Sequence, residues 1–523
     1  MTTAQRPAAT GALTPDVVER LLARAAAGGA PAVTVHAPVT GEAIAELPQS
    51  SAADIEGAFE RARAAQRQWA KVPVRERAAV LRRFHDLVLA EQGAILDIVQ
   101  TETGKSRVHA FDEVGDVAVN SRYYAATAPK LLARRNPRGV LPVLTDVQVR
   151  QRPKGVVAVI SPWNYPLALA VSDALPALVA GNAVVGRPDN QTALTALWAV
   201  DVAVRAGLPE GLWQIVLGRG SVIGGEVIDR ADYVDYTGSS ATGRTIGRQA
   251  GERLIGCSLE LGGKNPLLVL SDADPVAAAK TAVRASFASA GQLCESMERI
   301  YVHESVYDRF IGEFVPAVKG MKLGAPLDYT TDMGSLTFPR QLDTVRAHVD
   351  DAVAKGATVL AGGVHRPDLG PYFYEPTVLT DVTAEMTVYR EETFGPVVSV
   401  YKVADDDEAV ARANDTPYGL NASVWSRSAA RGREFAARIN AGSVNVNEGF
   451  IAAWGSADAP SGGVGISGTG RRHGPEGLLK YVDTQTIAVQ RMLPIAPLPG
   501  MSEAMWAKTM TLYFRVMKTL RQK

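Results

Sequence analysis

The chain has 523 residues, of which 46% are hydrophobic and 21% are charged, so it is long enough for two or three globular domains with cores of their own. Fifty-five basic residues balance fifty-five acidic ones, which argues against electrostatic binding of nucleic acid. Two cysteines exclude a disulfide framework, and seven histidines without ligand spacing give no sign of a metal site. A reducing cytoplasm is the simplest location.

The first part of the chain predicts helices that cover a sheet. Residues 1–31 lack the apolar core of a signal peptide, so no targeting segment is expected. Amphipathic helices are expected over residues 51–70, 74–91 and 92–102. Residues 155–186 carry a single charge, Asp173, and their hydropathy resembles that of a membrane span. Prolines and Asn164 interrupt this stretch, which predicts strand, turn, helix and strand instead.

Strands and helices alternate from residue 156 to residue 260. Strands are expected over 156–160, 213–217, 233–237 and 253–260 and from 183, with helices over 167–179, 192–206, 222–230 and 242–251. Such alternation predicts an α/β fold with a doubly wound parallel sheet. The pattern returns later, with strands over 299–303, 358–360 and 397–401 and helices over 304–319 and 345–355. A second α/β domain is therefore expected.

Two residues between 256 and 299 have the setting of catalytic groups. Cys294 follows a run of small residues and a glycine, which leaves a nucleophilic thiol accessible. Cys257 lies in an apolar run and fits the inert alternative. Glu260 ends that run just before two glycines, so we expect its carboxylate at a strand end, where it can act on water.

Two stretches lie outside the α/β pattern. Residues 139–151 and, more briefly, 486–491 alternate apolar and polar side chains. Exposed strand edges of this kind invite pairing with another chain, and a hairpin packed on its own subunit is the alternative.

The end of the chain predicts an amphipathic helix. Residues 501–520 place large apolar side chains, among them Trp506 and Tyr513, near one helical face, with Lys508 and Arg515 opposite. Such a helix lies on an anionic membrane or packs on a neighbouring subunit. The sequence favours the subunit, because the adjoining strand already has an oligomeric pattern.

Several motifs, in this order, resemble the aldehyde dehydrogenase superfamily. They are SPWNYP at 161–166, LELGGK at 259–264, GQLCESMER at 291–299 and EETFGP at 391–396, and the resemblance covers roughly residues 38–489. It implies a Rossmann-type cofactor domain, an α/β catalytic domain and protruding oligomerisation strands. It also implies NAD(P)-dependent oxidation of an aldehyde through a cysteine thiohemiacetal and a thioester. Because acylating relatives typically lack the glutamate, Glu260 favours hydrolysis of that thioester.

The resemblance also assigns parts of the chain to roles. It implies a cofactor domain over residues 31–133 and 154–262, a catalytic domain over 263–467, an oligomerisation arm over 134–153 and 482–495, and a tail over 496–523. A homodimer or homotetramer is expected. Cys294 would be the nucleophile, Glu260 the base and Asn164 an oxyanion donor. The expected cofactor residues are Trp163, Arg187, Asp189, Asn190, Gly238, Ser239, Gly243, Glu392 and Phe394, and no metal ligand is expected.

The turn that carries Gly238, Ser239 and Gly243 follows a strand and opens a helix, an arrangement that suits a pyrophosphate. Departures from the family pattern affect cofactor choice. Arg187 and Asn190 stand where most members have a lysine and a glutamate, and the missing carboxylate removes a group that repels a 2′-phosphate. We therefore expect NADP to be accepted, and to be preferred over NAD.

The substrate is less sharply defined. The resemblance is greatest to succinate-semialdehyde dehydrogenases, yet Ser172 and Asp173 stand where better-known members of that group carry an arginine. Ser461 and Arg472 also replace, respectively, an aromatic and an acidic residue that many relatives have. Succinate semialdehyde is the expected substrate, and a broad aliphatic or aromatic specificity, with or without membrane association, is the alternative. A non-catalytic protein on this fold would have no reason to keep the site residues together.

Overall fold

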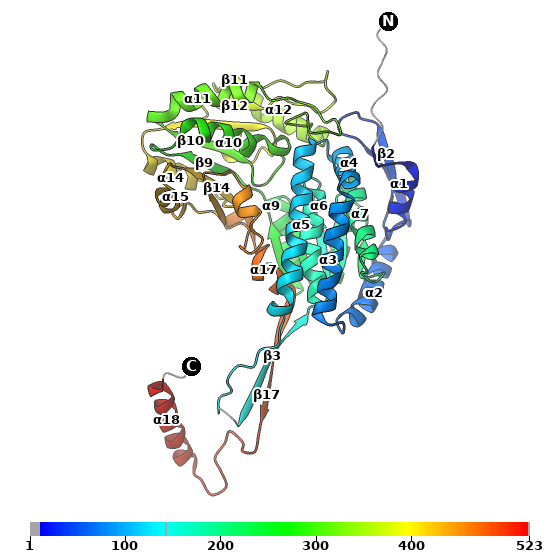
Figure 1. The fold of residues 1–523 in the computed structure, drawn as a ribbon, viewed down its shortest axis with the longest axis vertical. Helices are drawn as coiled ribbons and strands as arrows, with labels where there is room; N and C mark the ends of the chain where they lie inside the picture. Colours follow the sequence, from blue (N-terminus) through cyan, green and yellow to red (C-terminus); the bar gives the residue numbers. More distant parts are fainter. Residues whose placement is uncertain (1–10, 142–143, 521–523) are drawn as a thin grey trace. The chain divides into compact units, whose positions relative to one another are not determined.

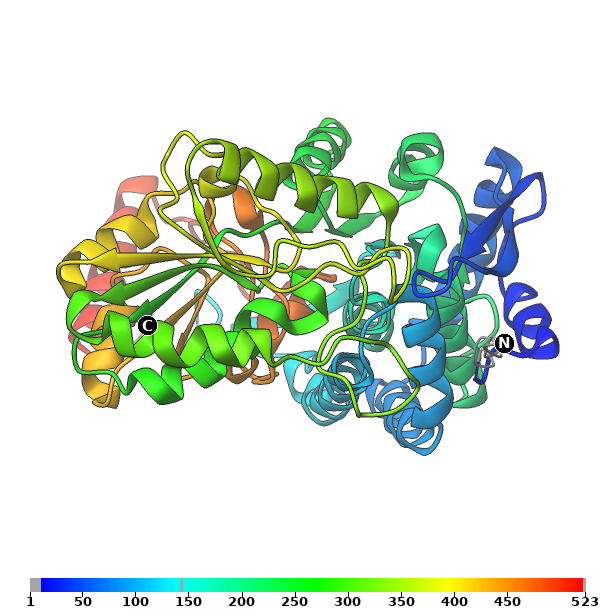
Figure 2. The ribbon, with the colours of Figure 1, turned by 90° about the horizontal axis from the view of Figure 1, so that it is seen from above.

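The computed structural model describes residues 11–141 and 144–520. The chain forms two compact units, of which the larger takes in Met1–Leu131 and Pro153–Tyr481 and the smaller Leu132–Arg152 and Val482–Lys523. Two sheets form the centre of the larger unit, and Figures 1 and 2 show helices packed around them.

The first sheet has six strands in the order β16-β8-β7-β4-β5-β6. Its strands are β4 (Val156–Ser161), β5 (Ala183–Pro188), β6 (Trp213–Ile215), β7 (Tyr233–Thr237), β8 (Gly256–Glu260) and β16 (Gly468–Thr469). Neighbours are parallel except β16, which runs antiparallel to β8. The connecting helices are α6 (Pro166–Ala180), α7 (Ala193–Arg205), α8 (Gly220–Arg230) and α9 (Ser240–Glu252). The predicted doubly wound sheet is confirmed, and its chain order reverses beside β4, where such folds bind ligands.

Helices from the first part of the chain pack against this sheet. They are α1 (Pro15–Leu22), α2 (Ala52–Trp69), α3 (Val74–Ala90), α4 (Gln92–Thr103) and α5 (Arg107–Leu131), with the β1 (Ala30–His36) and β2 (Ala43–Gln49) hairpin beside them. α2 begins with a capping box, in which Ser51 and Asp54 each accept the other's backbone N–H. α5 packs against α3 and α6 (Figure 1). The sequence did not predict α5, because polar residues such as His109, Glu113 and Asp116 lie on its buried face and break the apolar pattern.

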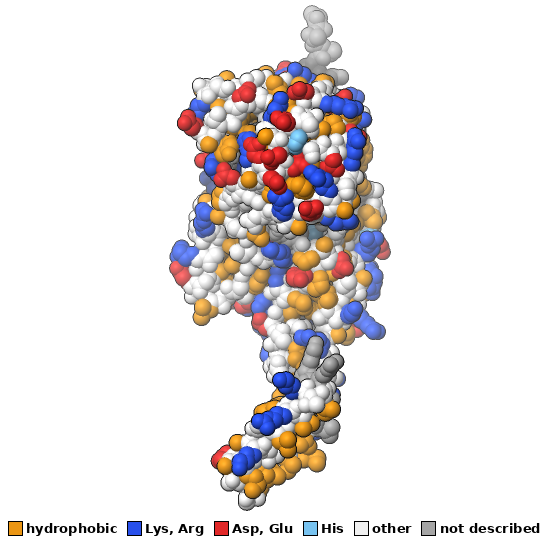
Figure 3. Space-filling model, turned by 90° about the vertical axis from the view of Figure 1, so that its left-hand side faces the viewer, with side chains coloured by type: hydrophobic (Ala, Val, Ile, Leu, Met, Phe, Trp, Pro, Cys, Tyr) orange, Lys and Arg blue, Asp and Glu red, His pale blue; other side chains and the backbone are white. Residues whose placement is uncertain are grey.

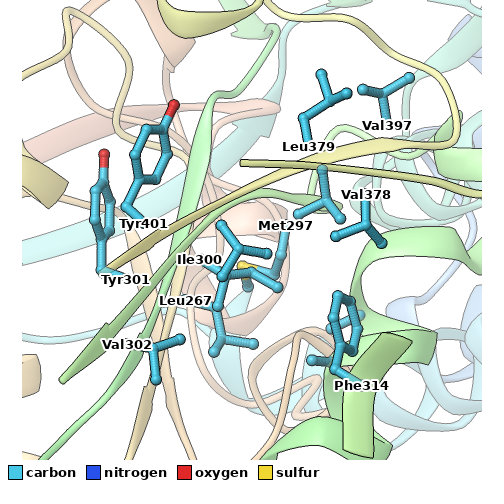
Figure 4. Packing of buried hydrophobic residues seen from close by; sticks show 14 of the residues in the cluster. Leu267, Met297, Ile300, Tyr301, Val302, Phe314, Val378, Leu379, Val397 and Tyr401 are labelled. Carbon is cyan, nitrogen blue, oxygen red and sulfur yellow. The ribbon is translucent and has the colours of Figure 1, made fainter. Parts of the chain in front are cut away.

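The second sheet has seven strands in the order β11-β12-β13-β10-β9-β14-β15, all parallel except β11. The strands are β9 (Asn265–Val269), β10 (Met297–His303), β11 (Thr358–Ala361), β12 (Thr377–Thr380), β13 (Val397–Val403), β14 (Asn421–Trp425) and β15 (Ser443–Val446). The helices are α10 (Pro275–Phe287), α11 (Glu304–Lys319), α12 (Pro339–Ala354), α13 (Thr387–Arg390), α14 (Asp406–Asn414) and α15 (Ala429–Ala436). Figure 4 shows the core of this sheet, where Leu267, Ile300 and Phe314 are fully buried. The second predicted α/β layer is confirmed.

Two local predictions around the first sheet were wrong. Leu254, expected in a strand, has a left-handed φ of 55° and is 94% exposed, so β8 begins two residues later. Cys257, which its apolar run predicts to be buried, is only half-buried, because β16 covers only the far end of β8, from Leu259 to Glu260. Residues 155–186 form β4, α6 and β5 as predicted. No helix within residues 11–141 and 144–520 has both the length and the hydrophobicity that crossing a bilayer requires.

The smaller unit contains a two-stranded sheet of β3 (Thr145–Pro153) and β17 (Val482–Gln490). The Thr145 hydroxyl donates to the Gln490 side chain at 2.7 Å, and Thr484 donates to Gln151 at 3.1 Å, so the strands run antiparallel. Helix α18 (Glu503–Thr519) follows, with Ser502 capping its first turn. The short helices α16 (Ile451–Trp454) and α17 (Gly474–Leu479) belong to the larger unit.

Candidate active site

Cys294 lies on the loop between α10 and β10, which turns sharply just before it. Ser289, Ala290 and Gly291 all have left-handed backbones, with φ values of 52°, 56° and 69°. A side chain at Gly291 would clash with the carbonyl oxygen of Gly395, so only glycine fits there. Left-handed non-glycine residues cost about 1–3 kcal/mol each and cluster at functional sites. The strained turn fixes the position of Cys294.

The surroundings of Cys294 keep its side chain protonated at rest. Asn265 Nδ2 donates to the Cys294 carbonyl at 2.7 Å and so holds the backbone. Burial raises the pKa of the thiol, and the carboxylates of Glu295 and Glu392 raise it further. Because a thiolate is the nucleophilic form, a base has to take the proton before Cys294 attacks.

Glu260 has the properties of that base. It ends β8 opposite Gly468, its side chain is 6% exposed, and its Oε1 atom has no hydrogen-bond partner among the described residues. Burial raises the pKa of this carboxyl to about 7, against the opposing charge of Arg472. A Cβ on Gly462 would lie 2.7 Å from Oε1, so glycine there leaves the carboxylate its room. A free carboxylate oxygen with a pKa near neutrality suits general base catalysis.

Asn164 follows β4 and reaches the cysteine loop. Its Nδ2 donates to the Gln292 carbonyl at 2.9 Å, which uses one of its two amide hydrogens. The backbone carbonyl oxygen of Asn164 accepts from Lys105 Nζ at 2.6 Å. Asn164 and Cys294 line the same cavity, so the predicted oxyanion donor and nucleophile are brought together.

Lys105 and Glu113 support Asn164, and sequence reasoning missed both. Their buried side chains form an ion pair of 2.6 Å. Glu113 Oε2 also accepts the backbone N–H groups of Leu167 and Ala168 at 2.8 and 3.1 Å, at the first turn of α6. The only signal in the sequence was a pair of charges, eight residues apart, in a segment that later proved buried.

The cavity that contains Cys294 has a volume of about 240 Å³. Its wall is mainly apolar, and its large apolar side chains include Phe111, Tyr165, Leu169, Leu293, Phe450 and Trp454. We call this space the substrate chamber. An engineered cavity of about 150 Å³ holds benzene, so the chamber has room for an aldehyde with a single ring or a medium-length chain.

Carboxyl groups are the charged side chains of the chamber wall. They belong to Asp112, Asp116 and Glu295, and no Lys, Arg or His is among the described residues that line it. Burial raises the pKa of Asp116 to about 7 and that of Glu295 to about 8. Asp112 is paired with Arg284 at 2.9 Å. The wall therefore offers a substrate carboxylate no cation to pair with.

Aromatic side chains meet next to the cysteine loop. The Trp163 ring packs edge-on against Phe338 and Phe394, with centroids 5.1 and 5.6 Å away. Phe394 has a left-handed φ of 51°. The neighbouring Glu392 Oε1 accepts Gly263 N–H at 2.7 Å, and burial raises the pKa of Glu392 to about 8. Three of the predicted cofactor residues therefore lie on or against residues 392–394, namely Trp163, Glu392 and Phe394.

The turn expected to bind a pyrophosphate follows β7. Ser239 is the N-cap of α9, and its hydroxyl oxygen accepts Thr242 N–H at 3.4 Å. A Cβ on Gly238 would clash with the Tyr236 hydroxyl, so a side chain there would displace that tyrosine. A Cβ on Gly243 would lie 2.5 Å from Leu261 Cδ2, so a larger residue there would displace that leucine side chain. The helix start remains suited to an anion.

The remaining cofactor candidates lie at the end of β5. Arg187 is buried rather than solvent-facing, and its Nε and Nη2 donate to the Gly218 carbonyl at 2.9 and 2.6 Å. Asp189 accepts a backbone N–H two residues on and caps a short 3₁₀ turn. Asn190 Nδ2 donates to Gln49 at 2.8 Å, while its buried Oδ1 has no partner among the described residues. Two nitrogens of the Arg187 guanidinium therefore already donate within the protein, which leaves fewer N–H groups for a phosphate.

Two departures from the family pattern prove to be partners. Arg472 binds Asp173 through two nitrogens, with Nε to Oδ1 at 3.0 Å and Nη2 to Oδ2 at 2.5 Å, and it also donates to Thr237. Both side chains are buried. The Arg472 charge lowers the pKa of Asp173 and opposes the rise at Glu260. Arg472 is therefore held by Asp173 and Thr237 and is not available to a substrate.

Known proteins match this chain along most of their length. The aldehyde dehydrogenase family matches residues 25–487. A Mycobacterium tuberculosis protein named "Putative succinate-semialdehyde dehydrogenase (NADP(+)) 2" is 54% identical over 480 residues, 92% of this chain and 93% of that one. A Mycolicibacterium smegmatis protein named "Putative succinate-semialdehyde dehydrogenase (NADP(+))" is 53% identical over 481 residues, again 92% and 93%.

A solved structure extends the match to the fold. Betaine aldehyde dehydrogenase from Staphylococcus aureus, in complex with NAD+, superposes with a TM-score of 0.85 at 31% identity, over 89% of this chain and 93% of that one. The expected aldehyde dehydrogenase fold and the resemblance carried by the LELGGK and GQLCESMER motifs are confirmed. This chain belongs to the aldehyde dehydrogenase family.

Proposed function

We propose that this protein oxidises an aldehyde to a carboxylic acid with NADP+ as the preferred hydride acceptor. The observation that carries the proposal is the chamber itself. Cys294 and Asn164 both line it, and the buried carboxyl of Glu260 interacts electrostatically with the Cys294 thiol. Nucleophile, oxyanion donor and base are what hydrolytic aldehyde oxidation needs.

The proposed chemistry begins when Glu260 accepts the thiol proton of Cys294. The sulfur bonds to the aldehyde carbon, and the carbonyl oxygen becomes an oxyanion next to Asn164 Nδ2 and the Cys294 backbone N–H. A bound nicotinamide cofactor supplies the acceptor for the hydride that leaves this carbon, and a thioester remains on Cys294. Glu260 releases the thiol proton to solvent and then takes a proton from water as the water oxygen attacks the thioester carbon. The carbon–sulfur bond breaks, the Cys294 sulfur takes the proton from Glu260, and the acid leaves.

Several residues fit a dinucleotide. Asn190 has a buried amide oxygen without a partner, and α9 presents a helix N-terminus at Ser239. Trp163, Phe394 and Glu392 would hold the nicotinamide side. The names of the two mycobacterial relatives specify NADP(+), and no carboxylate stands at position 190 to repel a 2′-phosphate. The relatives' names and the missing carboxylate support NADP+ over NAD+, while the free amide oxygen of Asn190 is an acceptor and fits a ribose hydroxyl.

The first substrate to test is succinate semialdehyde, because the mycobacterial relatives are named for it. The chamber favours a second candidate, an uncharged aliphatic or aromatic aldehyde. An unpaired carboxylate is costly to bury, and the wall offers apolar rings and carboxyl groups but no cation among the described residues. Rates with succinate semialdehyde, hexanal and benzaldehyde decide between the two.

The test of the activity is formation of NADPH when purified protein meets each of these aldehydes. We expect kcat/KM to exceed that of the Cys294→Ala protein by at least about a thousandfold with the best substrate. Failure of all three aldehydes with both NADP+ and NAD+ would refute the proposed function.

We further propose a cytoplasmic homodimer or homotetramer. The strands β3 and β17 form a two-stranded sheet, which is marginally stable by itself in water and leaves two edges to pair. Both cysteines are free, as expected in a reducing compartment. Light scattering of the purified protein gives the subunit number, and a monomer would contradict this proposal.

A further inference from the structure

Charge is unevenly divided between the two units of the chain. The smaller unit, residues 132–152 and 482–523, has eleven Lys and Arg against three Asp and Glu, a net charge of +8. The rest of the chain has forty-four against fifty-two, a net charge of −8. Figure 3 shows blue Lys and Arg side chains along this unit, with hydrophobic side chains beside them. A balanced total therefore conceals a strongly cationic segment.

Helix α18 adds a large apolar surface to this cationic unit. None of its residues is buried, and the exposed fractions of Met505, Leu512, Phe514 and Val516 lie between 46% and 63%. At 100° per residue the large apolar side chains of the helix span an arc of about 200°. The Tyr513 hydroxyl donates to the Val140 carbonyl of the same unit at 2.9 Å, so the middle of the arc is partly covered. The remaining exposed apolar side chains are unfavourable in water and call for a further covering surface.

The opposite side of the helix is cationic. Lys508, Arg515 and Lys518 lie within an arc of about 80°, and Glu503, in the first turn, is the one acidic residue of α18. Trp506 and Tyr513 are half-buried residues of the apolar arc. A helix with aromatic and aliphatic residues on a wide face and lysine and arginine on a narrow one lies in the plane of a membrane surface.

The position of the helix in the chain agrees with an added function. The family match ends at residue 487, so α18 lies outside the part of the chain that the family model matches. A lipid surface satisfies both faces at once, because acyl chains take the apolar arc and anionic headgroups take the flanking cations. A groove on a second copy would have to enclose an arc of about 200° while leaving the cations outside.

We propose that α18 anchors this protein to membranes that contain anionic lipid, lying in the interface without crossing it. The occupant of its apolar arc is the bilayer. The sequence pattern alone favoured a neighbouring subunit, and the charge of the whole smaller unit shifts the assignment to lipid. The proposal does not depend on the aldehyde or on the cofactor.

The experiment is co-sedimentation of the full-length protein with vesicles of phosphatidylcholine, with and without phosphatidylglycerol. We expect binding to the anionic vesicles, at least about tenfold weaker binding to the neutral ones, and release as salt is raised. Equal binding to both vesicles, or binding to neither, would overturn the proposal.

Two matched pairs of substitutions test the helix itself. Leu512→Asn with Phe514→Asn removes two apolar side chains, and Ala504→Asn with Thr511→Asn places the same amides on the cationic side. We expect the first pair to weaken vesicle binding by at least about tenfold and the second to leave it unchanged, with kcat/KM for the aldehyde the same in both. Replacing Lys508, Arg515 and Lys518 by Gln should weaken binding about a hundredfold.

Light scattering of the same variants tests the competing occupant. If the first pair lowers the subunit number and the second does not, α18 packs on a second copy and the membrane proposal is wrong. An unchanged subunit number together with lost vesicle binding supports it.

Discussion

Replacing Cys294 by alanine removes the proposed nucleophile, and Cys257 provides a control in the same chain. We expect Cys294→Ala to lower kcat by at least about a thousandfold while NADPH binding, followed by its fluorescence, is retained. Cys257 lies half-exposed on β8, away from the chamber wall, so Cys257→Ala should keep full activity. Appreciable turnover by Cys294→Ala would contradict the assignment of Cys294 as the nucleophile.

Glu260→Gln separates hydride transfer from thioester hydrolysis. Glutamine fills the same space but cannot accept a proton from the Cys294 thiol or from water, so a burst of up to one NADPH per site should form more slowly than in the parent and then stall. Because Glu260 has a pKa of about 7, the parent's turnover should fall below that pH as the base becomes protonated. Stopped-flow absorbance measures both, and a steady rate equal to the parent's would remove Glu260 from hydrolysis.

Cofactor choice is the third test at this scale. Asn190→Glu places a carboxylate where the 2′-phosphate of NADP+ is proposed to lie, so the ratio of kcat/KM for NADP+ over NAD+ should fall about tenfold to a hundredfold. Asn190→Ala serves as the control, since it removes the amide without adding charge. If the ratio of kcat/KM for NADP+ over NAD+ is the same in Asn190→Glu and Asn190→Ala, the side chain at position 190 does not contact the 2′-group of the cofactor.

Among single residues, the sequence pointed to the proposed reacting groups but not to the residues around them. Cys294, Glu260 and Asn164 stand in motifs that local spacing reveals. Lys105 and Glu113 act through contacts 59 and 54 residues away along the chain, which no local pattern encodes. The Arg472–Asp173 pair joins residues 299 positions apart, so each was noted as a departure without its partner being visible.

At the scale of elements, α5 supplies the rim of the substrate chamber through Phe111, which is 44% exposed. Phe111→Arg adds a cation there, and Phe111→Glu adds the opposite charge at the same position. If the chamber lacks a partner for a carboxylate, the arginine should raise kcat/KM for succinate semialdehyde about tenfold relative to the glutamate, with little difference for benzaldehyde. No difference between the two variants would mean that the semialdehyde carboxylate binds elsewhere.

The same helix shows where pattern reading fails. Five strands of the first sheet and three of the second were predicted, because they are short apolar runs between turns, and β7 was placed to the residue. α5 escaped because its buried face carries Glu113, Asp116 and Asn120 for the site, so function overrides the amphipathic pattern. β8 was placed too early because Leu254, although apolar, stands in an exposed turn.

For the whole molecule, buried carboxyl groups set how stability depends on pH. Burial raises the pKa of Glu260 to about 7 and of Glu102, Glu295 and Glu392 to about 8, above the ordinary value of 4.5. Between pH 4.5 and 8 the folded chain therefore binds more protons at these groups than the unfolded chain does. Their contribution to stability is complete below pH 4.5 and is lost as pH rises through 7 to 8, at roughly 1.4 kcal/mol per unit of pKa shift at most.

The melting temperature should therefore fall as pH rises from about 6.5 to about 8.5. Glu295→Gln removes one of these groups, and its Oε2 has no hydrogen-bond partner among the described residues, so the substitution breaks no contact at that atom. The fall should be smaller in Glu295→Gln than in the parent, and Glu313→Gln, at an exposed position of α11, should follow the parent. Scanning calorimetry across this range makes the comparison. A melting temperature that rises with pH, or the same fall in Glu295→Gln as in the parent, would mean that the buried carboxyl groups are ionised in the folded chain without cost.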